Sequence, residues 1–301
     1  MNNSRGTAVL KAFSPEKEYF IGIDSDGCAF DTMEIKHKEC FCPAFINHFN
    51  LQAVSKYARE TWEFVNLYSR TRGTNRFRAL MHTLELLAER EEVSDREVKI
   101  PELKSFKEWL KTETKLGNPA LKQAAEKSED PELKLILAWS EEVNNTVAKI
   151  VRNIAPFPFV RESLEKIQTT ADVVVISQST REALEREWNE NNITRYVKLI
   201  AGQEMGTKTE HIHYTAGGKY RSGRVLMIGD APGDLNAARN NNALFFPIIP
   251  GKEEKSWERF YSEGIERFFD NTYAGSYEST LIEEFFINLP EHPPWSAHAV
   301  S

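Results

Sequence analysis

The sequence contains few cysteines, no excess of basic residues and no long apolar segment. Three cysteines in 301 residues, Cys28, Cys40 and Cys42, are too few for a disulfide framework and indicate reduced thiols. Lys and Arg number 38 against 45 Asp and Glu, so the net charge of −7 does not indicate a nucleic-acid-binding surface. No segment approaches the roughly 18 apolar residues of a membrane span, and Met1 to Glu18 lack the apolar region of a secretion signal. We therefore expect a cytoplasmic protein that binds neither nucleic acid nor membranes.

Five short apolar segments predict the strands of one sheet. They are Tyr19–Ile23, Val173–Ile176, Val197–Ala201, Val225–Ile228 and Leu244–Ile249, of which Val197–Ala201 is the weakest. Helical patterns separate the segments that follow residue 170, and this βαβ spacing predicts parallel strands. Hydrophobic residues make up 41% of the chain, which is enough for the core of such a sheet.

Between the first strand and the others, the pattern is helical. Apolar residues recur at helical spacing from Val54 to Tyr68 and from Leu133 to Val151, while Pro101 and Pro131 fit the first turns of further helices. The sequence therefore predicts an α/β protein, a Rossmann-like core with a parallel sheet into which an all-helical domain is inserted. The expected bounds are residues 1–33 and 156–301 for the core and residues 34–155 for the helical domain.

Three of the predicted strands are followed by polar residues. These residues are Asp24-Ser25-Asp26-Gly27, Ser177-Gln178-Ser179, and Gly229-Asp230 with Asp234 close behind. In a parallel sheet the carboxyl ends of the strands meet at one crevice. Carboxylates gathered there repel one another unless a cation neutralises them, and oxygen ligands without a histidine or cysteine cluster favour Mg²⁺.

In this order, the polar segments resemble the four motifs of the haloacid dehalogenase (HAD) superfamily. The motifs are Asp24-Ser-Asp26-Gly27-Cys-Ala-Phe-Asp31-Thr32, Ser177, Lys208 and Gly229-Asp230-x-x-x-Asp234. The helical insertion resembles the C1 cap of that family in position only, so the resemblance covers about residues 1–33 and 156–260. It implies a HAD-type hydrolase. The presence of Asp26 indicates the phosphatase-like members of the superfamily, because the dehalogenase-like members lack this second acid.

The same residues account chemically for the hydrolysis of a phosphate monoester. A phosphate dianion repels a carboxylate, so attack by Asp24 requires Mg²⁺ to screen both and produces an aspartyl-phosphate. Asp26 can protonate the leaving alcohol and then deprotonate water, provided that Gly27 lets the chain turn tightly. Ser177 can donate a hydrogen bond to a phosphoryl oxygen, and Lys208 can neutralise the developing charge.

The expected Mg²⁺ site contains Asp24, Asp230 and Asp234, the last of which holds a metal-bound water or a neighbouring side chain. The resemblance adds the backbone carbonyl of Asp26 as a ligand. Thr209 follows Lys208 where the family commonly has a proline, so two other lysines could fill this role. The alternatives to Lys208 are Lys198 and Lys219.

Ser179 and the pair His211 and His213 are not assigned to the chemistry of the site. Ser179 begins an S-x-x-E pattern that is typical of a helix N-cap, and we assign it to that role. His211 and His213 have no matching second pair for a metal, and we expect both on the surface.

Four arginines without an intervening acid lie between Ser69 and Leu80, where Gly73-Thr74-Asn75 interrupts the helical pattern. As a hypothesis, Arg72 and Arg76 bind a second anionic group of the substrate, because a guanidinium suits bidentate contact with phosphate or carboxylate. A solvated basic helix face is the alternative for these arginines. Gln178, beside Ser177, is also assigned to substrate binding.

The sequence thus favours a Mg²⁺-dependent phosphomonoester hydrolase that acts on a small phosphorylated metabolite. A phosphotransferase or phosphosugar mutase would use the same aspartyl-phosphate, and a non-catalytic binding protein could keep the same fold. Phosphonate cleavage would require a Schiff-base lysine in the helical domain, and the presence of Asp26 argues against it. The pattern indicates neither the particular ester nor the oligomeric state.

Overall fold

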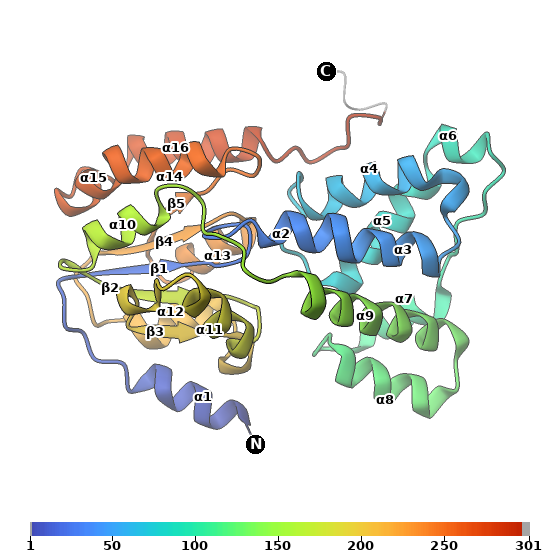
Figure 1. The fold of residues 1–301 in the computed structure, drawn as a ribbon, viewed down its shortest axis with the longest axis horizontal. Helices are drawn as coiled ribbons and strands as arrows, with labels where there is room; N and C mark the ends of the chain where they lie inside the picture. The colour runs from blue at the N-terminus through green and yellow to red at the C-terminus, as the bar shows by residue number, and fades with distance from the viewer. Residues whose placement is uncertain (1, 297–301) are drawn as a thin grey trace. The chain divides into compact units, whose positions relative to one another are not determined.

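The computed structural model describes residues 2–296, with side chains from residue 6 onward, and these residues form two compact units (Figure 1). One unit contains residues 2–33 and 153–289, and the other contains residues 34–152 and 290–296. The division expected from the sequence differs at two places. It began the second core segment at residue 156 and put the residues after 289 with the core, whereas residues 290–296 group with the helical unit.

The first unit is built on a five-stranded sheet with the order β3-β2-β1-β4-β5. Its strands are β1 (Tyr19–Ile23), β2 (Ala171–Ile176), β3 (Leu199–Ala201), β4 (Val225–Gly229) and β5 (Leu244–Pro247). All four neighbouring pairs are parallel, which confirms the sheet predicted from the apolar segments. The central strands are buried throughout because helices cover both faces, as is typical of parallel sheets.

Helices pack on the two faces of the sheet in two separate hydrophobic clusters. The helices of the core unit are α1 (Asn2–Lys11), α10 (Val160–Ile167), α11 (Arg181–Glu190), α12 (Lys208–Ala216), α13 (Pro232–Arg239), α14 (Glu253–Arg259), α15 (Ile265–Phe269) and α16 (Ser276–Ile287), with a π-helix at Phe260–Gly264 and short 3₁₀ turns at Thr194–Tyr196 and Gln203–Met205. Residues from α10, α11, α14 and α15 join one cluster, and residues from α12 and α13 join the other. Side chains on β1 alternate between them, since Ile21 and Ile23 belong to the first cluster and Phe20 to the second.

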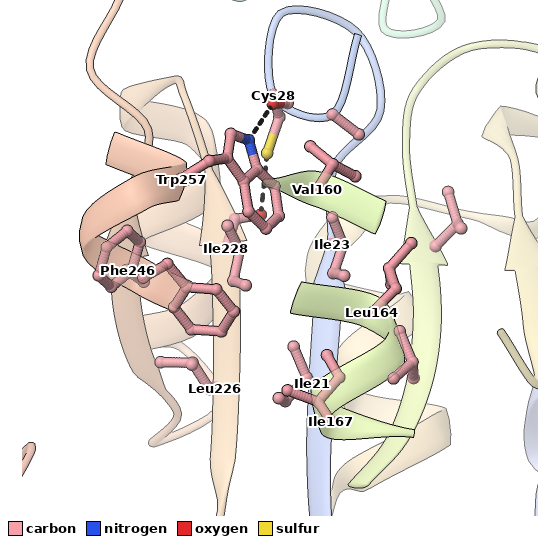
Figure 2. Close-up of a cluster of buried hydrophobic side chains, with 14 of the residues drawn as sticks. Ile21, Ile23, Cys28, Val160, Leu164, Ile167, Leu226, Ile228, Phe246 and Trp257 are labelled. Carbon is pink, nitrogen blue, oxygen red and sulfur yellow. Dashed lines mark hydrogen bonds between the residues drawn. The ribbon is translucent and has the colours of Figure 1, made fainter. Parts of the chain in front are cut away.

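Figure 2 shows part of the first cluster, where α10 and α14 meet β1 and β4. The indole N–H of Trp257, on α14, donates to the backbone carbonyl of Cys28 at 2.7 Å. The thiol of Cys28 in turn lies 3.7 Å from the carbonyl of Ile228, at the end of β4. These contacts fasten the loop after β1 to the hydrophobic core, which fixes the position of the polar residues that the loop carries.

The second unit consists of helices in the residues that the structure describes. They are α2 (Thr32–Ile35), a π-helix at Lys36–Phe41, α3 (Cys42–His48), a 3₁₀ turn at Gln52–Val54, α4 (Ser55–Asn66), α5 (Arg76–Ala88), α6 (Glu91–Ser94), α7 (Lys104–Thr112), α8 (Asn118–Ser128) and α9 (Pro131–Ile150). α2 begins in the core unit and ends in the helical unit. Buried aromatic side chains, among them Trp62, Phe77 and Trp139, fill the unit's centre.

The helix predictions are partly confirmed. α4 and α9 occupy the two segments with helical periodicity, and Pro131 stands at the first position of α9 behind the N-cap Asp130. Pro101 does not begin a helix, because α7 begins at Lys104. Among residues 2–296, no helix combines the length and the apolar character that crossing a membrane requires.

Candidate functional site

The candidate site lies where β1, β2 and β4 end, at the centre of the sheet. Asp24 follows β1, Ser177 follows β2 and Asp230 follows β4. The register pairs Ile23 with Ile228, and the backbone N–H of Asp24 donates to the carbonyl of Ile228 at 3.0 Å. The chain therefore leaves the neighbouring strands at one edge, as the motif order predicts.

Asp24 is buried, and both of its carboxylate oxygens have partners. Oδ1 accepts a hydrogen bond from the backbone N–H of Ser25 at 2.8 Å, and Oδ2 lies 2.8 Å from Nζ of Lys208. Burial raises the pKa of Asp24 well above its usual range. The charge of Lys208 opposes this rise, whereas the charges of Asp234 and Asp230 add to it. Asp24 therefore depends on positive charge nearby to remain ionised.

Lys208 supplies that charge from the first residue of α12. The helix begins with a capping box in which Thr207 and Glu210 satisfy each other's backbone N–H groups, so the start of the helix is well defined. Nζ of Lys208 lies 2.5 Å from Oδ1 of Asp234 as well as beside Asp24. Burial alone would lower the pKa of Lys208. The surrounding carboxylates, Asp234 foremost, outweigh burial and hold the pKa well above its usual range.

The two alternative lysines lie elsewhere in the core unit. Lys198 donates to the backbone carbonyl of Ser14 at 2.5 Å, and Lys219 donates to that of Phe13 at 2.8 Å. Ser14 and Phe13 precede β1, so these lysines lie at the amino ends of the strands. Of the three lysines considered, Lys208 is the one that the structure brings to Asp24.

Asp230 and Asp234 complete a cluster of three buried carboxylates. One ligand atom each from Asp24, Asp230 and Asp234 lies within 4.8 Å of the others. Oδ2 of Asp234 also accepts from the backbone N–H of Ala231 at 3.1 Å, which fixes its side chain at the start of α13. Three carboxylates against one ammonium leave excess negative charge, and an all-oxygen donor set suits a hard divalent cation. The residues present therefore fit a metal ion.

Two hydroxyls donate hydrogen bonds to the carboxylate of Asp26. The side chain of Thr32 donates to Oδ1 of Asp26, and the side chain of Ser179 donates to Oδ2. Gly27 follows with a φ of +75°, and its N–H donates to the carbonyl of Phe30 at 2.8 Å. This conformation favours glycine, so the tight turn that was required of Gly27 is present.

The segment after β2 brings a further hydroxyl and an amide to this part of the core. Ser177 is buried, its backbone N–H donates to the carbonyl of Ala201 at 3.1 Å, and its Oγ accepts from the N–H of Ser179 at 3.3 Å. Gln178 is exposed and donates to the carbonyl of Gly206 at 3.1 Å. These contacts tie the loop after β2 to the end of β3 and to the loop that precedes α12.

Ser179 contacts Asp26 and does not cap α11, the role expected for it. The N-cap of α11 is Thr180, whose side chain accepts from the N–H of Ala183 at 3.3 Å, so the assignment of Ser179 as the cap is wrong. The partner of a hydroxyl depends on the conformation of its loop, and it differs between adjacent residues such as Ser179 and Thr180. The contacts of Ser179 and Thr32 with Asp26 were missed for this reason, and the position of both residues close to strand-end motifs was the only signal.

The two arginines proposed for substrate binding differ in environment within the helical unit. Arg72 is buried, and its Nη1 donates to the backbone carbonyl of Leu67 at 2.9 Å. Arg76 donates to Oγ of Ser140 at 3.0 Å and to Oδ1 of Asn144 at 2.7 Å. Burial lowers the pKa of Arg76 to about 10, and no carboxylate contributes to this shift. Arg76 is therefore a cation whose described partners are neutral.

The chain also matches the model of a protein family. The model of the haloacid dehalogenase-like hydrolases matches residues 81–247, slightly more than half of the chain. That segment includes Ser177, Lys208, Asp230 and Asp234 and begins after Asp24. No curated protein matches the chain.

Solved structures with a similar fold come from several bacteria. A candidate phosphoglycolate phosphatase from Lactobacillus delbrueckii subsp. bulgaricus is 14% identical, with 83% of this chain and 98% of that chain covered and a TM-score of 0.49. A haloacid dehalogenase-like family hydrolase from Xanthomonas campestris is 10% identical, with 87% and 96% covered and a TM-score of 0.45. A candidate phosphatase from Clostridium difficile is 17% identical, with 86% and 100% covered and a TM-score of 0.44.

Proposed function

Because this chain belongs to the haloacid dehalogenase-like hydrolase family, we propose that it hydrolyses phosphate monoesters of small metabolites through an aspartyl-phosphate on Asp24. The observation that carries this proposal is the cluster around Lys208, whose Nζ lies 2.8 Å from Asp24 and 2.5 Å from Asp234. A buried carboxylate that is compensated by a fixed cation is prepared for attack on an anionic ester.

The reaction takes place in two displacements. A carboxylate oxygen of Asp24 forms a bond to phosphorus while the ester P–O bond breaks, and the carboxylic acid of Asp26 gives its proton to the leaving alkoxide. Asp26 then takes a proton from water, whose oxygen bonds to phosphorus as the bond to Asp24 breaks. Inorganic phosphate and an alcohol are the products. The hydroxyls of Thr32 and Ser179 hold the Asp26 carboxyl in place through both steps.

The family typically uses a divalent metal, and we propose Mg²⁺ for this site. Asp24, Asp230 and Asp234 are the carboxylates that would hold it, together with the backbone carbonyl of Asp26. When bound, the ion supplies positive charge that screens the phosphate dianion from the nucleophile. Asp234 also holds Lys208, so it connects the metal site to the fixed cation.

Other side chains are proposed to bind the rest of the substrate. Ser177 and Lys208 donate to the phosphoryl oxygens, and the exposed Gln178 lies next to Ser177 in sequence. In the helical unit, Arg72 and Arg76 are proposed for a second anionic group of the substrate, because a guanidinium suits bidentate contact with phosphate or carboxylate. A cytoplasmic location agrees with the three cysteines, all of which are free thiols.

The proposal is tested by phosphate release from p-nitrophenyl phosphate and a panel of metabolite monoesters, with Mg²⁺ and with chelator. We expect Mg²⁺-dependent release that Asp24→Asn lowers by more than about a thousandfold, because the amide cannot act as the nucleophile. Asp270→Asn, an exposed position in the same unit, is the matched control and should retain full activity. Full turnover by Asp24→Asn would refute the proposal. An isomeric phosphate ester in place of free phosphate would identify a mutase.

A further inference from the structure

Ser25 lies between the proposed nucleophile Asp24 and the proposed acid Asp26, and its hydroxyl does not face solvent. The residue is fully buried. Its Oγ donates to Oε2 of Glu187 at 2.9 Å and accepts from the indole N–H of Trp188 at 3.0 Å. Both partners are adjacent residues of α11, so one helix fixes this hydroxyl by a donor and an acceptor together.

The backbone of Ser25 organises the loop after β1. Its N–H donates to Oδ1 of Asp24 at 2.8 Å. Its carbonyl accepts from the N–H groups of three following residues, Cys28 at 3.3 Å, Ala29 at 2.9 Å and Phe30 at 3.1 Å. A displacement of Ser25 would therefore change both the orientation of the Asp24 carboxylate and the turn that carries Asp26.

α11 contacts the same loop a second time. The ring of Trp188 packs edge-on against Phe30, with centroids 5.7 Å apart and planes at 76°. Trp188 thus contacts the beginning of the turn through Ser25 and its end through Phe30. The bond from Ser25 to Glu187 adds a third contact between α11 and this loop.

We propose that Glu187 and Trp188 are positioning residues for the reaction described above, acting on Asp24 through Ser25. Neither residue needs to touch the substrate. Their contribution is to hold Ser25 so that its N–H fixes one oxygen of Asp24 while Lys208 fixes the other. Rates of this chemistry depend strongly on such alignment, since a misplacement of about 1 Å can cost a hundredfold.

The test compares Ser25→Ala, Glu187→Ala and Glu185→Ala, which is a control on the same helix. The Glu185 side chain is 43% exposed and pairs with Arg181. We expect Ser25→Ala and Glu187→Ala to lower kcat by about tenfold with little change in KM, because alignment is lost and substrate contacts remain. Glu185→Ala should match the wild type in both constants.

Hydrogen–deuterium exchange of residues 24–30 gives a readout that does not depend on activity. Exchange should be faster in Ser25→Ala and Glu187→Ala than in the wild type and unchanged in Glu185→Ala. If Ser25→Ala does not fold, Glu187→Ala carries the test, since its side chain is only half-buried.

The inference rests on the proposed function, and the two can fail separately. Unchanged kcat and exchange in Glu187→Ala would overturn the positioning role while wild-type phosphate release stands. Faster exchange with unchanged kcat, or an effect confined to KM, would also overturn it. If the wild type releases no phosphate while exchange rises in Glu187→Ala, the proposed phosphatase is refuted, and α11 still holds the loop.

Discussion

His211 is a buried imidazole in α12, one turn after Lys208. Burial lowers its pKa to about 4, an effect that Glu210 opposes and Lys208 reinforces. The unfolded chain takes up a proton at the ordinary value of 6.5, whereas the folded protein does not do so until about pH 4. Stability is therefore lost as the pH falls from 6.5 toward 4, by up to about 3 kcal/mol.

We expect His211→Phe, which keeps an aromatic ring, to remove this component of the acid sensitivity. The measurement is the free energy of unfolding in urea between pH 7.5 and pH 4 for both proteins. The wild type should lose stability relative to the variant below pH 6.5, and the difference should be constant above that pH. Parallel pH profiles for the two proteins would contradict the prediction.

At the residue scale, the sequence predicts the positions that strand ends fix. Asp24, Ser177 and Asp230 follow parallel neighbouring strands, so the order of the strands alone brings their backbones together. Side-chain partners are a different matter. His211 was expected on the surface and is buried, because one face of α12 packs on the sheet and the short histidine pattern does not show which face.

At the scale of elements, the connection from β4 to α13 depends on the glycine at the end of the strand. A Cβ at Gly229 would lie 2.5 Å from Cγ of Asp234, so no other residue leaves room for this carboxylate. Gly229→Ala should displace Asp234 from Lys208 and lower the free energy of unfolding by roughly 1–3 kcal/mol, with loss of activity. Chemical denaturation and phosphate release together measure both effects.

The control for this prediction is Gly233→Ala in the same connection. Gly233 lies in the first turn of α13, and a Cβ there would meet no atom within 4 Å. Alanine should leave activity unchanged and raise stability by about 0.5–1 kcal/mol through its helix propensity. If both substitutions change stability and activity equally, the loss in Gly229→Ala is caused by reduced backbone flexibility and not by the contact with Asp234.

The elements themselves were predictable to different degrees. Strands buried on both faces appear as continuous apolar segments, and β1, β2 and β4 were found from this signal. α1 has no such signal and was not predicted. Its Leu10 packs with Ala201 and Met205, contacts with residues far away in the sequence. Tertiary packing of this kind cannot be inferred from a ten-residue segment.

At the scale of the whole molecule, the chain passes between the two units three times. Residues 33 and 34, 152 and 153, and 289 and 290 are the neighbouring pairs assigned to different units. The first two crossings follow from the helical pattern inserted between predicted strands. The third does not, because it depends on where a short proline-containing segment packs, and this is decided by residues far away in the sequence.

The third crossing leads to a contact that should stabilise the helical unit. The N–H of Arg70 donates to the carbonyl of Pro290 at 3.3 Å, and Trp295 packs against Phe64 with centroids 5.6 Å apart. The guanidinium of Arg90 lies 4.2 Å from the centroid of the Trp295 ring, and its side chain is only 3% exposed. Trp295 therefore covers a buried cation that also pairs with Glu60 and Glu92.

Trp295→Ala should expose Arg90 and lower the stability of the helical unit by roughly 1–3 kcal/mol, through lost apolar burial and a lost cation–π contact. Hydrogen–deuterium exchange should become faster in α4, which carries Phe64, and in α5, which ends just before Arg90. Exchange should stay unchanged in β1 and β4. Trp295→Phe keeps a ring over the guanidinium and should lie close to the wild type. If α4 and α5 exchange equally in all three proteins, the segment after residue 289 does not stabilise the helical unit, and the third crossing has no role in holding it together.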